Sequence, residues 1–380
     1  MKHIQLVILC FVSFTLGAQI TVTNKYFPQA GDTLLTATDN MPSGIEVGTP
    51  GPDRTWNFKS LQSPLIVRTI VRPASEGAAA VDFPDADLVF KLNENAEGYY
   101  RLTDNTLELI GLSGTDPINL GIDIQPKLNE PQIERWAPLK YGDTHDSAVN
   151  FSYALDADEI PQDLLDILPI TPDSIRVRLK LNRHDEVDAW GTMSIPGGDY
   201  EVLREKRTLD QDIRLDAKIG ILGWQDITDI VLGLTDLGGD VLGNSQIVRY
   251  HYWGEGVKEA IAVVTMNPDQ TAIATVDFKA EDILADLVQT TDKLQPSVLA
   301  YPNPAMAHTN FQFMQLKPGN YRLVIYNLVG SEVWHQNYRI HGPLTERVSL
   351  SNLKKGTYLY ALQDERGRTL ITRRLVVVRP

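Results

Sequence analysis

The chain has 380 residues, of which 43% are hydrophobic and 22% are charged, and its formal net charge is −14. This composition suits a folded protein with a sizeable core and excludes disorder along the whole length, while the length predicts two or three domains. Because an acidic chain is repelled by nucleic-acid phosphates and by anionic lipid, neither is expected as a ligand.

The first eighteen residues have the organisation of a secretory signal peptide. Lys2 and His3 form a basic head, residues 4–16 are almost entirely apolar, and Gly17 and Ala18 provide small residues for cleavage. A membrane anchor is the alternative, but a helix over this run would span only about 20 Å of a hydrocarbon core of about 30 Å. No later stretch approaches 18 apolar residues, so no transmembrane segment is expected after cleavage.

Cys10 is the only cysteine, and it lies inside the apolar run of the signal peptide. The mature protein is therefore expected to contain no cysteine. This excludes disulfides, thiolate metal sites, iron–sulfur clusters and a cysteine nucleophile.

Residues 19–288 are predicted to form an acidic, β-rich passenger domain of the β-sandwich type, with one or two subdomains. Short strands are expected at residues 20–24, 54–58 and 65–71. Residues 174–182 alternate strictly, so Ile175 and Val177 are expected to face the core and Arg176 and Arg178 the solvent. Residues 187–195 and 200–207 are predicted to form a hairpin through Pro196-Gly197-Gly198, and residues 246–278 a meander. Helix is expected only at residues 162–168, 227–237 and 281–288.

The net charge changes sign near residue 295. Residues 19–295 carry 23 Lys/Arg against 45 Asp/Glu, a net charge of −22, whereas residues 296–380 carry 11 against 4, a net charge of +7. A step of this size predicts two domains with different partners, separated by a linker at residues 289–297.

Residues 298–380 are predicted to form an immunoglobulin-like sandwich of six or seven short strands. Several short motifs follow one another in this region: Tyr301-Pro302-Asn303-Pro304, Gly319-x-Tyr321, Gly330, Leu353 and Gly356-x-Tyr358. In this order they resemble the type A C-terminal sorting domain of the type IX (Por) secretion system.

The resemblance implies the route and the partners of the protein. It implies export through the inner membrane and then across the outer membrane, with the secretion machinery recognising the C-terminal domain. The passenger would be released or would be linked to surface polysaccharide. Residues 187–204 also resemble a stretch of exported β-proteins that carry the same tail, which implies no activity.

No catalytic or cofactor motif stands out in the passenger. The histidines of the mature chain lack metal-pair spacing, and there is no Gly-x-Ser-x-Gly elbow, P-loop or dinucleotide fingerprint. Calcium is the one metal considered, because Asp156, Asp158, Glu159, Asp236 and Asp240 place oxygen donors on predicted loops. These residues do not match an EF-hand, and solvated loop acids are the simpler interpretation.

Two functions for the passenger stay open. The first is a non-catalytic surface or extracellular protein that binds a glycan, a partner protein or no small ligand. Its aromatic candidates for stacking on a sugar are Tyr250, Tyr252, Trp253, Trp190 and Trp224, for which core packing is the alternative. The second is a secreted hydrolase that acts on polysaccharide or peptide through a pair of passenger carboxylates.

Overall fold

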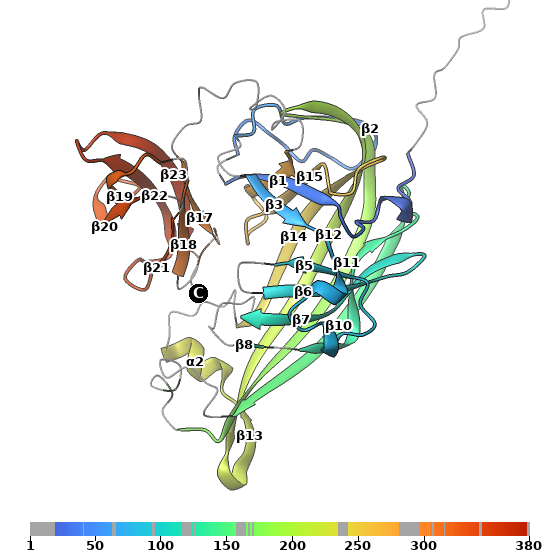
Figure 1. Ribbon diagram of the computed structural model, residues 1–380, viewed down its shortest axis with the longest axis horizontal. Helices are drawn as coiled ribbons and strands as arrows, with labels where there is room; N and C mark the ends of the chain where they lie inside the picture. Colours follow the sequence, from blue (N-terminus) through green and yellow to red (C-terminus); the bar gives the residue numbers. More distant parts are fainter. Residues whose placement is uncertain are drawn as a thin grey trace, which may run out of the picture.

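The computed structural model describes residues 20–377 apart from several segments, and these include most of the region between the two parts of the chain. The segments left out are residues 41, 63–65, 93–95, 116–122, 125, 157–164, 166–167, 169–170, 235–241, 281–296, 302, 304, 306–307, 315 and 342–343. The prediction of an all-β protein is confirmed, since strands dominate from one end of the described chain to the other (Figure 1). The signal peptide lies outside the described residues.

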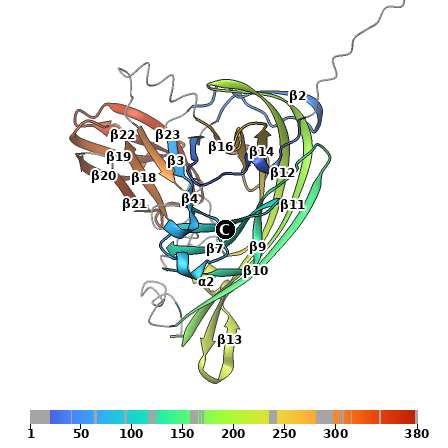
Figure 2. The same cartoon turned by 45° about the vertical axis from the view of Figure 1, so that its right-hand side comes forward.

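A ten-stranded sheet forms the body of the passenger, and its longest strands curve along one side of the molecule (Figures 1 and 2). Its main path runs β10-β11-β12-β14-β15-β16-β1-β3, with β13 added to β12 and β2 added in parallel to β11. The bounds are β1 (Thr33–Asp39), β2 (Gly51–Asn57), β3 (Ile66–Ile70), β10 (Thr144–Asp156), β11 (Ser174–Ile195), β12 (Gly198–Ile219), β13 (Gly223–Asp226), β14 (Gly243–Gly254), β15 (Ala262–Met266) and β16 (Ile273–Lys279).

The predicted hairpin is the longest feature of this sheet. Strands β11 and β12 have 22 residues each, and Ile195 pairs with Gly198 across the turn. Gly197 adopts φ 98°, which only glycine adopts easily and which the Pro-Gly turn requires. The break expected between residues 182 and 187 is absent, because a single bulge between Val187 and Ala189 lets one strand continue through both predicted segments.

A six-stranded sheet packs against the long one. Its path is β4-β5-β6-β7-β8, and β9 pairs with β7. Strand β9 also packs against β10, so it lies over the inner face of the long sheet. The bounds are β4 (Arg72–Pro73), β5 (Leu88–Lys91), β6 (Ala96–Leu102), β7 (Thr106–Thr115), β8 (Asp123–Ile124) and β9 (Lys127–Trp136).

Helix is scarce among the described residues, as expected. Helix α2 (Thr228–Leu234) falls within the predicted helix at residues 227–237 and packs on the far end of the long sheet. The predicted strand at residues 20–24 is wrong, since only Val22 bridges to Leu139 and a 3-10 helix follows at once. The predicted helices at 162–168 and 281–288 lie largely or wholly outside the described residues. The 3-10 helices are η1 (Asn24–Tyr26), η2 (Ala74–Glu76), η3 (Ala80–Asp82) and η5 (Gly220–Leu222).

The C-terminal region consists of a three-stranded sheet, β17-β18-β21, and a four-stranded sheet, β20-β19-β22-β23. Both sheets contribute to one apolar core, with Phe311 and Phe313 from the first and Leu323 and Leu375 from the second. This is the expected sandwich. The bounds are β17 (Ser297–Tyr301), β18 (His308–Met314), β19 (Gly319–Asn327), β20 (Glu332–Ile340), β21 (Leu344–Ser349), β22 (Gly356–Asp364) and β23 (Thr369–Val377).

Candidate ligand-binding site

Charged side chains gather on the inner face of the long sheet, in the part that β9 covers. The strand register explains why they meet. Asp185 of β11 pairs with Arg207 of β12, Arg207 pairs with Arg249 of β14, and Glu205 pairs with His251. Side chains of directly paired residues share one face of a sheet, as do residues two apart on one strand, so these groups form two adjacent rows, Asp185-Arg207-Arg249 and Glu205-His251.

Two buried carboxylates anchor this row. Asp185 and Glu205 are each only 1% exposed. Asp185 accepts hydrogen bonds from Arg183 Nη2 at 2.8 Å and from Trp136 Nε1 at 3.2 Å. Glu205 accepts from Arg207 Nε at 3.0 Å and from the indole nitrogen of Trp253 at 2.7 Å.

Arg135 of β9 packs against this cluster. Its guanidinium carbon lies 4.3 Å from the ring centroid of Trp253, and its Nη1 donates to the backbone oxygens of Tyr26 and Lys258. Burial, followed by the neighbouring charge of Arg207, lowers the pKa of Arg135 to about 10. The group remains cationic at neutral pH, so the cluster holds a fourth arginine beside Arg183, Arg207 and Arg249.

The pKa of His251 reflects the positive charge of this region. Burial is the first cause that holds its pKa well below the usual range, and the charges of Arg207, Arg249, Arg183 and Arg135 act in the same direction. The imidazole is therefore neutral at pH 7. Its ring stacks beside that of Trp253 at a centroid distance of 5.5 Å, and its Nδ1 is buried without a hydrogen-bond partner.

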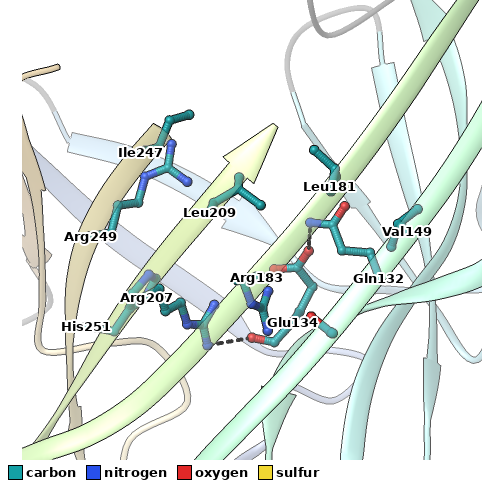
Figure 3. A pocket seen from close by; sticks show the side chains of 11 residues that line it. Gln132, Glu134, Val149, Leu181, Arg183, Arg207, Leu209, Ile247, Arg249 and His251 are labelled. Atoms are coloured by element: carbon teal, nitrogen blue, oxygen red, sulfur yellow. Dashed lines mark hydrogen bonds between the residues drawn. The ribbon is translucent and has the colours of Figure 1, made fainter. Parts of the chain in front are cut away.

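A hollow of about 110 Å³ lies between β9 and the long sheet, directly beside the cluster (Figure 3). One part of its wall is apolar and the other part is polar. Figure 3 shows Glu134 and Gln132 of β9 on one side and Arg249 and Ile247 of β14 on the other. The apolar lining is Val149, Leu181, Leu209 and Ile247, and the polar lining is Gln132, Glu134, Ser147, Arg183, Arg207, Arg249 and His251.

Two guanidinium nitrogens beside the hollow keep their donor capacity. The hydrogen bonds of Arg183 to Asp185 use Nε and Nη2, and those of Arg207 to Glu205 and to the backbone oxygen of Glu134 use the same two atoms. The Nη1 atoms of Arg183 and Arg207 donate to none of the described residues. Glu134 is the single carboxylate of the lining, and one of its oxygens accepts from Gln132 Nε2 at 2.8 Å.

Sequence reasoning missed this cluster, although the alternation of β11 contains a signal for it. Every second residue of this strand faces inward. Residues 175, 177, 179 and 181 at these positions are apolar, and the next two inward-facing residues, Arg183 and Asp185, are charged. Charged residues at positions that face a core mark a buried ion network. The aromatic candidates behave differently, because Tyr252 and Trp253 are buried and Trp224 stacks on Arg176 at 4.5 Å, which favours core and scaffold roles over a sugar-binding face.

The calcium candidates are only partly within the described residues. Asp156 ends β10 and its Oδ1 accepts a hydrogen bond from Ser174 Oγ at 3.0 Å. Asp158, Glu159, Asp236 and Asp240 lie outside the described residues. Among the residues that are described, no group of three or more His, Cys, Asp or Glu could hold a metal ion, and no helix is long and apolar enough to cross a membrane. Calcium binding stays a prediction.

The motif residues of the C-terminal region occupy turns and strand ends. Tyr321 Oη donates to the backbone oxygen of Lys317 at 2.8 Å, and Tyr358 Oη donates to that of Lys354 at 2.7 Å. Each tyrosine follows a Leu-Lys-x-Gly-x sequence, so one corner motif occurs at the start of both β19 and β22. The strands that follow these corners pair antiparallel in the centre of the four-stranded sheet.

The remaining motif residues also have local structural roles. Asn303 bonds to β23 through both ends of its amide, since Nδ2 donates to the oxygen of Arg374 and Oδ1 accepts from the nitrogen of Val376, both at 2.8 Å. Gly330 adopts φ 82° in the turn between β19 and β20, and Gly356 begins β22. Leu353 is buried in the core, and Tyr301 ends β17. Pro302 and Pro304 lie outside the described residues.

Comparison with protein families identifies this C-terminal region. Residues 299–378 match the family described as the secretion system C-terminal sorting domain. The chain is therefore a type IX secretion cargo, exported across the outer membrane to the cell surface or beyond it, and its sorting domain is the part that engages the secretion machinery. Searches of curated proteins and of solved structures found no significant match.

Proposed function

We propose that the passenger of this exported protein is a non-catalytic extracellular binding protein, with the hollow beneath β9 as its binding site. One observation carries the proposal: a hollow with an apolar part to its lining lies beside Arg183 and Arg207, whose Nη1 atoms donate to none of the described residues. Concave, largely apolar sites with a few converging polar groups are the usual form of small-ligand sites.

The carboxylates give little support to a hydrolase. Glycoside hydrolysis uses two carboxyl groups that both reach the substrate. Only Glu134 lines the hollow, while Asp185 and Glu205 are held by arginine and tryptophan donors and are nearly inaccessible.

The test is to assay the purified mature chain against a panel of polysaccharides and peptides, alongside Glu134→Gln as a matched variant. No hydrolysis above the buffer rate is expected from either protein. Turnover by the wild type that falls at least 100-fold in Glu134→Gln would overturn the proposal and establish the hydrolase instead.

A further inference from the structure

We propose that the ligand of this hollow is a small monocarboxylate with a branched or compact apolar body. This inference rests on the proposed binding function and specifies the chemistry of its ligand. Three features of the wall carry it: the size of the hollow, the unequal distribution of charge, and the apolar floor beside the guanidinium donors.

The size restricts the body of the ligand. The hollow measures about 110 Å³, which is below the roughly 150 Å³ of an apolar cavity that accepts one benzene molecule. Space of this size holds a body of about four or five carbon atoms. A polysaccharide or peptide segment exceeds this volume.

The charges of the wall select a single negative charge. Three arginines line the hollow, Arg183, Arg207 and Arg249, and Arg135 lies beside them. The Nη1 atoms of Arg183 and Arg207 can donate charge-assisted hydrogen bonds to a carboxylate. Glu134 belongs to the same lining and lies beside Arg183 and Arg207 (Figure 3), so a dianion or a second carboxylate would meet a like charge there.

The apolar floor separates a carboxylate with a body from an inorganic anion. Leu181, Leu209 and Ile247 contribute to the lining beside the arginines. Sulfate or phosphate would desolvate against these side chains without gaining apolar contact, whereas a branched alkyl group would bury its surface there. A neutral amide of the same shape offers one carbonyl oxygen and no charge, so it would pair with the guanidinium donors more weakly than a carboxylate does.

The experiment compares three probes on the full mature chain by titration calorimetry or ligand-observed NMR. Isovalerate carries both features, isovaleramide has the same shape without the charge, and sulfate has charge without the body. We expect isovalerate to bind at least 10-fold more tightly than isovaleramide, and sulfate not to compete at the same concentration.

Variants of the chain connect the binding to the hollow. Arg249→Gln removes the charge of an exposed side chain that lines the hollow and is expected to weaken binding of isovalerate about 10-fold. Leu209→Trp fills the space and is expected to abolish binding of isovalerate. Arg214→Gln is the matched control, because Arg214 lies on the outer face of β12 beside Asp212, and it is expected to leave the affinity unchanged. Circular dichroism checks that each variant is folded. If Leu209→Trp does not fold, Arg249→Gln still tests whether isovalerate binds in the hollow.

The outcomes separate the two proposals. Equal binding of isovalerate and isovaleramide, lost in Leu209→Trp, would overturn the carboxylate assignment and leave the hollow as a binding site. Effective competition by sulfate would also overturn the assignment, since it would mean that the apolar floor plays no part. Absence of binding by all three probes, or binding that neither Arg249→Gln nor Leu209→Trp changes, would overturn the site together with its ligand.

Discussion

The sorting domain and the passenger bury different kinds of side chain. In the sorting domain the two sheets enclose a core of aliphatic and aromatic residues, with tyrosine hydroxyls and Thr309 among its buried polar groups. The inner face of the long passenger sheet instead buries Arg183, Asp185, Glu205 and Arg207 beside one another. Buried ion networks seldom stabilise more than apolar residues of similar volume. The comparison teaches that the sorting domain is built for stability, whereas part of the passenger interior gives up stability at the place where its hollow lies.

The largest expected effect is on export of the protein and not on its folding. Deletion of residues 298–380 should leave essentially all of the passenger in the periplasm, because it removes the part that engages the secretion machinery. Cell fractionation with an antibody to the passenger measures this. A point variant that keeps the tail, such as Arg214→Gln, should be exported normally, and undiminished export of the truncated chain would contradict the assignment of the route.

The second prediction tests whether the buried charges are a cost to the passenger. Glu205→Ala leaves Arg207 buried without its carboxylate and should lower the free energy of unfolding of the passenger by about 3–5 kcal/mol. The double variant Glu205→Leu/Arg207→Met should come within about 1–2 kcal/mol of the wild type or exceed it. Urea unfolding monitored by tryptophan fluorescence gives both values.

A matched core variant sharpens this result. Phe311→Ala in the apolar core of the sorting domain should lower the free energy of unfolding by about 3–5 kcal/mol. Unlike the loss in Glu205→Ala, this loss should not be recovered by a second substitution of a neighbouring residue. If Glu205→Ala costs less than about 1 kcal/mol, the passenger network is not a counter-ion system and the contrast between the two regions fails.

The smallest effect is the dependence of stability on pH. Burial and the surrounding arginines hold the pKa of His251 below that of the unfolded chain, about 6.5, so below that pH the unfolded state binds more protons. The contribution of neutral His251 to the free energy of unfolding should therefore be fully present above about pH 7. It should decrease on acidification, by at most about 1.4 kcal/mol per pH unit.

The sorting domain offers the comparison for this effect. Burial, followed by Arg347, lowers the pKa of His308 to about 4, but this side chain remains partly exposed. The same sign is expected between about pH 6.5 and 4, with a smaller amplitude because solvent screens the group. His251→Gln should flatten the passenger profile between pH 7 and 5 and His308→Gln should not; an unchanged passenger profile in His251→Gln would show that other groups control it.

Much of the fold could be predicted from local sequence because it depends on local signals. The alternation that begins at Ile175 and the Pro196-Gly197 turn specify a hairpin through contacts between neighbours in sequence. Its full length was harder to predict, since the bulge at Val187 carries the strand across a segment whose pattern shifts by one residue. The strand expected at residues 20–24 failed because its backbone meets only Leu139, far away in the sequence.

The candidate site could not be predicted because it depends on pairing between distant strands. Arg207 is one of many arginines in the sequence until β12 pairs with β14 and places Arg249 beside it. The contribution of β9, with Gln132 and Glu134, depends on a different sheet folding over the first. The charged residues at inward-facing positions of β11 were the one local signal for the site. They indicate a buried network without naming its partners.

The pairing of β1 with β16 has a consequence for the order of events during export. Thr38 and Asp277, which share a hydrogen bond in this pair, are 239 residues apart. A chain that emerges from the inner membrane with its N-terminus first cannot close the long sheet until nearly the whole passenger has crossed. Until then β1 presents an open edge to the periplasm, where it can pair with other chains. Maturation of this cargo therefore requires that the early part of the chain stay separate from other strands until β16 arrives.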